Sequence, residues 1–177
     1  MIRIRYTRGP VMKDHIEIVL DDGSNRVAAL RNVVVHVRRG AQTLQSLELL
    51  IGSWRSLKHR IEGNIFAVSV ITEDAGTVSA EVRKRRIAVV KELTSHRRLH
   101  LAVVIEGEGL VADLRRIMVR GVADARTKIY RDTQEAARTI ATMPDAPTLE
   151  EMLAVIDAAC NLDSDCPMSW RSGPRSG

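Results

Sequence analysis

The chain has 177 residues, which is enough for one domain of ordinary size with short tails. Hydrophobic residues make up 45% and charged residues 28%, a balance that excludes a disordered or fibrous chain. We find no apolar stretch of the roughly 18 residues that a membrane span needs. The N-terminus alternates charged and apolar residues without a continuous apolar signal region, so we expect a cytoplasmic protein.

The formal net charge is +5, from 27 Lys and Arg against 22 Asp and Glu. A basic balance can serve nucleic-acid binding through phosphate neutralisation. Here acidic residues are mixed with basic ones almost everywhere, so we do not expect a nucleic-acid partner. Cys160 and Cys166 are the only cysteines, and two thiols without a nearby histidine do not make a structural zinc site. We expect reduced thiols, no metal and no cofactor.

The N-terminal region predicts short strands. Residues 1–11 alternate and end near Gly9-Pro10, so they form either a loosely attached arm or a product of start-site assignment. A strand over 15–20 follows, then a turn over 21–25, and then a strand over 33–37 that ends at Gly40.

From Gln42 the apolar residues follow a helical period, with one stripe that continues to Leu57. Leu49 points away from this stripe and is either a lone exposed leucine or a contact for a partner. The nearly continuous apolar run over 65–71 predicts a strand that is covered on both faces. A loop over 72–77 follows it.

Ser79 is placed to cap a helix that begins at Ala80. Arg86 interrupts the apolar stripe of this helix, between Val82 and Val89. It is either an arginine whose stem packs while its head reaches solvent, or an arginine that faces a partner or binds an anion.

A second buried strand is predicted over 101–105, and Gly107-Glu108-Gly109 then turns the chain. With Ala112 this turn matches a G-x-G-x-x-A pattern, but Glu106 and Glu108 would face the phosphates of a dinucleotide, so we interpret it as a tight turn. The next helix, over 110–122, has the clearest amphipathic pattern of the chain, with Arg116 and Arg120 on the polar side.

A short edge strand over 127–130 precedes two further helices. Capping boxes open them at Asp132 and at Thr148, and Pro144 and Pro147 separate the two. The last helix runs to about Cys160, and residues 161–177 have the composition of a flexible tail.

Alternation of this kind predicts an α/β fold: a mainly parallel sheet of βα units with an antiparallel N-terminal hairpin. We expect an arm over 1–11, a domain over 12–143, a C-terminal helix within 144–160 and a tail over 161–177.

From about His15 to Ala141, this layout resembles the STAS domain of anti-sigma factor antagonists and the related STAS/SEC14-like bacterial proteins. The segment from Leu101 to Ile117, LAVVIEGEGLVADLRRI, carries the resemblance most closely. In STAS regulators a serine at a helix start is phosphorylated, within an Asp-Ser-x-Gly type motif. By position, the resemblance implies Ser79 as the phosphoacceptor and Thr77 as a weaker alternative. Val78 and Glu81 stand where the family has Asp and Gly.

The sequence shows no catalytic motif, neither a G-x-S-x-G elbow nor a Walker sequence nor an H-E-x-x-H pair. We therefore expect a non-enzymatic regulatory module that binds a protein partner, with Arg86 and Leu49 as candidate contacts. The alternative is a domain that binds a small ligand such as a lipid or a nucleotide, which would need a sizeable apolar cavity between sheet and helix. The oligomeric state is not predicted.

Overall fold

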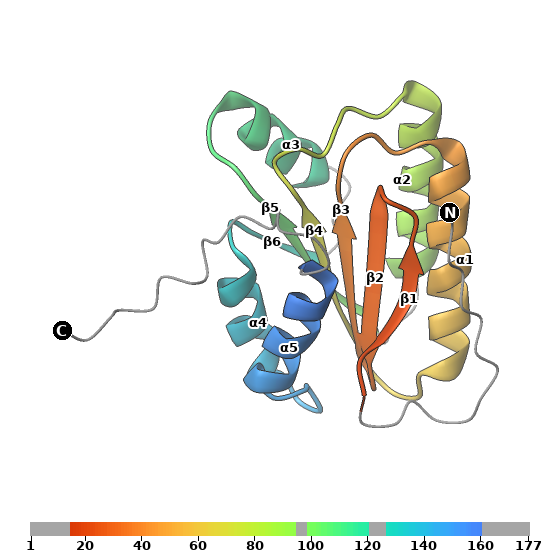
Figure 1. Ribbon diagram of the computed structural model, residues 1–177. Helices are drawn as coiled ribbons and strands as arrows, with labels where there is room; N and C mark the ends of the chain where they lie inside the picture. Colours follow the sequence, from red (N-terminus) through yellow and green to blue (C-terminus); the bar gives the residue numbers. More distant parts are fainter. Residues whose placement is uncertain (1–14, 95–98, 121–126, 161–177) are drawn as a thin grey trace.

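The computed structural model describes residues 15–94, 99–120 and 127–160 (Figure 1). The arm predicted over 1–11, the tail predicted over 161–177, and Cys166 lie outside these ranges. The strands are β1 (Glu17–Asp21), β2 (Asn25–Leu30), β3 (Val33–Arg38), β4 (Ile65–Ile71), β5 (Leu99–Ile105) and β6 (Thr127–Tyr130). The helices are α1 (Leu44–Arg60), α2 (Ala80–Thr94), α3 (Leu110–Arg120), α4 (Thr133–Ala141) and α5 (Leu149–Cys160).

The six strands form one sheet in the order of the sequence, from β1 to β6. Antiparallel pairs join β1 to β2 and β2 to β3, whereas β3, β4, β5 and β6 run parallel. A helix lies between the two strands of each parallel pair in the sequence, as is usual because parallel neighbours need a long crossover connection. The predicted α/β class, with antiparallel strands at the N-terminal side of a parallel sheet, is confirmed.

Helices cover both faces of the sheet, and Figure 1 shows α1 and α2 on one side and α4 and α5 on the other. Successive strand residues point to opposite faces, so alternate positions of β3 and β4 belong to different cores. Val35 and Phe66 pack with α4 and α5, whereas Val34 and Ala67 pack with α1 and α2. Alternate residues of one strand therefore meet different chemical surroundings.

Local signals in the sequence set the helix ends. Thr43 caps α1 in a reciprocal box with Ser46. Asp132 accepts a hydrogen bond from the Glu135 amide at the start of α4. Thr148 and Glu151 exchange hydrogen bonds at the start of α5, so this predicted box is confirmed.

The structure adds one strand to the predicted set. β2 lies between the two antiparallel strands expected at the N-terminus, and all six of its residues are buried. Its first residues, Asn25 and Arg26, are polar, and they hide the strand pattern because a buried strand is normally recognised by its apolar run.

The amphipathic helix α3 turns its apolar side away from the core, where Leu110, Val111, Leu114 and Ile117 are exposed. The inward residues are Ala112, Arg116 and, in part, Val119. The Arg116 guanidinium donates hydrogen bonds to the carbonyl oxygens of Ile105 at 2.9 Å and Gly107 at 2.8 Å. These bonds satisfy carbonyl groups at the end of β5 and turn the polar side of the helix inward.

Candidate functional site

Polar side chains interrupt the core where β3 and β4 approach their carboxyl ends, on the face covered by α1 and α2. His36 and Arg38 alternate with buried valines in β3, and Ser69 lies beside His36 in β4. The carboxyl ends of parallel strands are the usual place for ligand sites in α/β folds. These residues therefore define the first candidate site.

A hydrogen-bonded row holds His36 in one tautomer. Asn25 Oδ1 can only accept, and it takes hydrogen bonds from His36 Nε2 at 3.1 Å and from Gln42 Nε2 at 2.8 Å. The other ring nitrogen, Nδ1, then accepts the proton of the Ser69 hydroxyl, 3.2 Å away. The hydroxyl proton of Ser69 thus points to His36.

The row Ser69–His36–Asn25 has the order of a nucleophile, a base and an orienting amide. Burial, with the positive charges of Arg86 and Arg38, lowers the pKa of His36 from 6.5 to about 3. An effective general base has a pKa near the working pH, so His36 is a weak one at neutral pH. The row is better suited to binding than to proton abstraction.

Arg86 reaches from α2 toward this row. Its side chain is half-buried and lines a cavity of about 90 Å³, together with His36 and Ser69. Among the described residues, none forms a hydrogen bond or an ion pair with the Arg86 guanidinium. Burial lowers the pKa of Arg86, because desolvation disfavours the charged form.

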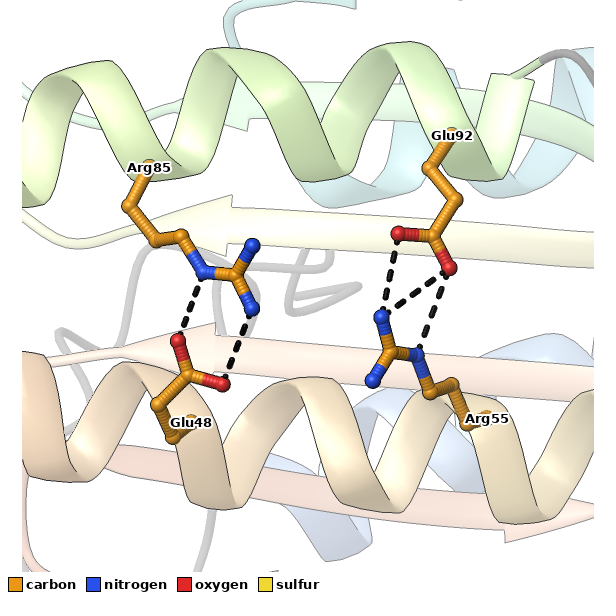
Figure 2. A network of polar contacts seen from close by, with 4 residues as sticks. All are labelled: Glu48, Arg55, Arg85 and Glu92. Atoms are coloured by element: carbon orange, nitrogen blue, oxygen red, sulfur yellow. Dashed lines mark hydrogen bonds and ion pairs between the residues drawn. The ribbon is translucent and has the colours of Figure 1, made fainter.

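Most of the cavity wall is apolar. Helix α1 contributes Leu47, Leu50, Ile51 and Trp54, and α2 and β5 complete the wall. Two ion pairs hold α2 against α1 (Figure 2). Arg85 Nε lies 2.6 Å from Glu48 Oε1, and Arg55 Nη2 lies 3.1 Å from Glu92 Oε2. Thus Arg85 has a carboxylate partner on α1, whereas its neighbour Arg86 faces the cavity.

Arg38 and Arg115 organise the loop that follows β4. Arg38 donates to the Gly76 carbonyl at 3.0 Å, and Arg115 of α3 donates to the carbonyl oxygens of Thr72 and Ala75. Burial lowers the pKa of Arg38 to about 10, with further contributions from Arg86 and Arg115. The loop is thereby fixed to both β3 and α3.

An acidic group lies at the same edge of the sheet, beside the start of α3. Burial raises the pKa of Glu106, and the nearby carboxylates of Asp74 and Glu73 raise it further, against the opposing effect of Arg39. Glu108 is exposed in the following turn. The turn contains Gly107 and Gly109 at positive φ. The carboxylates of Glu106 and Glu108 would repel a phosphate bound at this turn.

The second candidate site is the outer face of α3. Four large apolar side chains are 50–76% exposed there: Leu110, Val111, Leu114 and Ile117. We call these four residues the α3 apolar face. Scattered exposed leucines are normal, whereas a contiguous apolar patch marks an interaction surface.

The predicted contact residues lie in different surroundings. Thr77 and Ser79 are exposed, and Ser79 Oγ accepts a hydrogen bond from the Val82 amide at 3.2 Å, so it caps α2. Leu49 is half-buried and packs against the core beneath α1, and Arg86 faces the cavity. The structure does not bring these four residues together, and their roles in binding stay predictions.

His36, Arg38 and Ser69 are additional site residues that were not predicted from the sequence. A signal was present in β3, where His36 and Arg38 replace apolar residues at alternate positions and so share one face. Neither their partners nor the cavity could be inferred from spacing, because those contacts come from β2, β4 and α2.

Within residues 15–94, 99–120 and 127–160, no cluster of His, Cys, Asp or Glu has the arrangement of a metal site. None of the helices in these ranges combines the length and the apolar character needed to cross a membrane. Comparisons with protein-family models, curated proteins and solved structures gave no match. The relationship to STAS domains stays a prediction.

Proposed function

We propose that this chain is a non-enzymatic, cytoplasmic regulatory module that binds a protein partner, as the resemblance to STAS domains implies. Its contact surface is the α3 apolar face together with the acidic loop after β4. The exposure of these four apolar residues is the observation that carries the proposal, because a helix side of this kind favours burial against another surface. The low pKa of His36 supports binding rather than catalysis.

The chemistry around the α3 apolar face indicates which partner it fits. Glu73, Asp74 and Glu108 are exposed at its border, and Arg115 connects α3 to the loop that carries Glu73 and Asp74. A partner segment with apolar residues and flanking Lys or Arg would complement both features. The same acidic border would repel the phosphate backbone of a nucleic acid.

A photo-crosslinking residue placed at Leu114 in the full chain, expressed in its native cell, tests this proposal. We expect adducts with another protein through an apolar, basic segment, identified by mass spectrometry. A crosslinker at Leu153 is the control, because this α5 residue is 36% exposed and lies outside the acidic border. Leu153 should not give the same adduct.

The double variant Leu114→Glu, Ile117→Glu should lower recovery of that partner at least tenfold, since the carboxylates would replace the apolar contacts and would lose water against the partner's apolar residues. Leu153→Glu should leave recovery unchanged. Crosslinks from position 114 to a second copy, or to residues 1–14 or 161–177 of the same chain, would refute the proposed partner. Undiminished recovery with the double variant would refute the surface.

Phosphorylation of Ser79 is the regulatory step that the STAS resemblance implies, with Thr77 as the alternative. Both side chains are exposed, and a phosphate on Ser79 would lie at the positive N-terminal end of α2. The negative charge of Glu81 in the first turn would repel this phosphate. Mass spectrometry of the native protein should find a phosphorylated fraction. If residues 72–81 stay unmodified under several growth conditions, this regulatory step is refuted while the binding surface is not.

Binding of a small ligand is a second candidate function, favoured by the cavity beside Arg86. Its volume of about 90 Å³ is small for a lipid or a nucleotide, since pockets for drug-sized ligands measure roughly 300 Å³ or more. If the chain binds a small ligand in this cavity, the ligand is therefore much smaller than a lipid or a nucleotide.

A further inference from the structure

We propose that the cavity between the sheet and helices α1 and α2 binds a short-chain monocarboxylate. The carboxylate would pair with the guanidinium of Arg86, and the aliphatic tail would lie among the apolar residues of α1. This inference is independent of the α3 apolar face, since the two sites share no residue.

The positive charge in the wall of the cavity indicates that its ligand is an anion. Arg86 lines it without a carboxylate partner among the described residues, and the charged groups that act on His36 there are the cations Arg86 and Arg38. A half-buried cation beside other cations is unfavourable unless an anion joins it. The neighbouring Arg85 has such an anion in Glu48, whereas Arg86 is open to a ligand.

The geometry of arginine favours a carboxylate. The guanidinium is a planar fork that matches two carboxylate oxygens. One open guanidinium lines the cavity, and a monoanion balances one positive charge. A phosphate would place several polar oxygens against a largely apolar wall.

The small volume and the apolar wall of the cavity indicate that the ligand has a short apolar tail. Leu47, Leu50 and Trp54 form part of the wall. A cavity of roughly 150 Å³ accommodates the six carbons of benzene, so about 90 Å³ suits three or four non-hydrogen atoms. The three-carbon tail of butyrate has this size, and its carboxylate would lie at Arg86, where the cavity is partly open. Butyrate is therefore the appropriate probe, and 1-butanol is the uncharged control of the same length.

Trp54 provides a direct signal for binding. The chain has two tryptophans, so a Trp170→Phe background leaves Trp54 as the only one, and its side chain lines the cavity. Titration with butyrate should give a saturable change in fluorescence. Butanol should bind at least tenfold more weakly, and inorganic phosphate should not displace butyrate.

Arg86→Met in the same background should weaken butyrate binding at least tenfold, whereas the matched control Arg83→Met, at an exposed position of the same helix, should change it less than twofold. Arg86→Met should also raise the Tm of the ligand-free protein by about 2–4 °C, because it removes a half-buried charge that has no anionic partner within the described ranges. A decrease in Tm would show that Arg86 is a structural residue and would overturn the inference. So would equal binding of butanol, displacement by phosphate, equal losses in the two variants, or absence of saturable binding.

Discussion

A single histidine in β3 makes the stability of the fold depend on pH. His36 is 4% exposed and neutral, held between Ser69 and Asn25. Its pKa is about 3 in the folded protein, against 6.5 for an ordinary histidine. Between these two values the unfolded chain binds a proton that the folded protein does not bind. The free energy of unfolding therefore rises with pH through this window. The contribution of His36 is lost progressively as the pH falls below about 6.5.

We expect His36 alone to account for about 2 kcal/mol of lost stability between pH 7.5 and pH 5. Denaturant unfolding at the two pH values measures this difference for the wild type and for His36→Gln. The pH-dependent loss should shrink by about that amount in the variant, because the glutamine does not titrate. His59→Gln is the control, since His59 is exposed, and it should keep the loss of the wild type. An equal loss in wild type and His36→Gln would contradict the assigned cause.

At the scale of elements, α2 is held over the cavity by charged contacts with α1. Both ion pairs involve partly exposed side chains, and each arginine lowers the pKa of its carboxylate partner. Exposed pairs contribute little to global stability, although bidentate geometry makes them more effective. Their main effect is therefore expected on the local opening of α2 rather than on the whole fold.

The double variant Glu48→Gln, Glu92→Gln should accelerate amide hydrogen exchange in α2 by about 2–5-fold, because both contacts in Figure 2 are weakened. Exchange in α5, which packs on the opposite face of the sheet, should stay unchanged. Hydrogen exchange read by mass spectrometry gives both rates. Glu151→Gln, which removes the exposed pair with Arg31, is the control and should not affect α2. Uniform acceleration in both helices would indicate global destabilisation and contradict the local role.

Helix α3 shows where a sequence pattern is ambiguous at this scale. An amphipathic period establishes that one side of a helix is apolar, but it does not say whether that side meets the core or another molecule. The decision depends on Arg116, whose hydrogen bonds to the end of β5 hold the polar side inward. Such bonds join residues 9 and 11 positions apart, and nothing in the local spacing indicates them.

At the scale of the whole molecule, the order of helices and strands after β3 follows from the sequence. Strand β4 is an apolar run, and α4 and α5 begin at capping residues that the sequence already indicates. Strand β2 was hidden because its buried polar residue Asn25 takes part in the His36 row. The sheet order itself places β3 beside β4 and so brings Ser69 against His36.

The sequence by itself determined the α/β class and most of the helices and strands, because periodicity, capping and apolar runs act over short distances along the chain. Only the tertiary structure decided which residues form the candidate sites. The cavity, the neutral His36 and the position of Arg86 in the cavity wall depend on contacts between β2, β3, β4 and α2. The burial of a side chain and the charges around it are set by residues far away in sequence, and a local pattern contains no information about them.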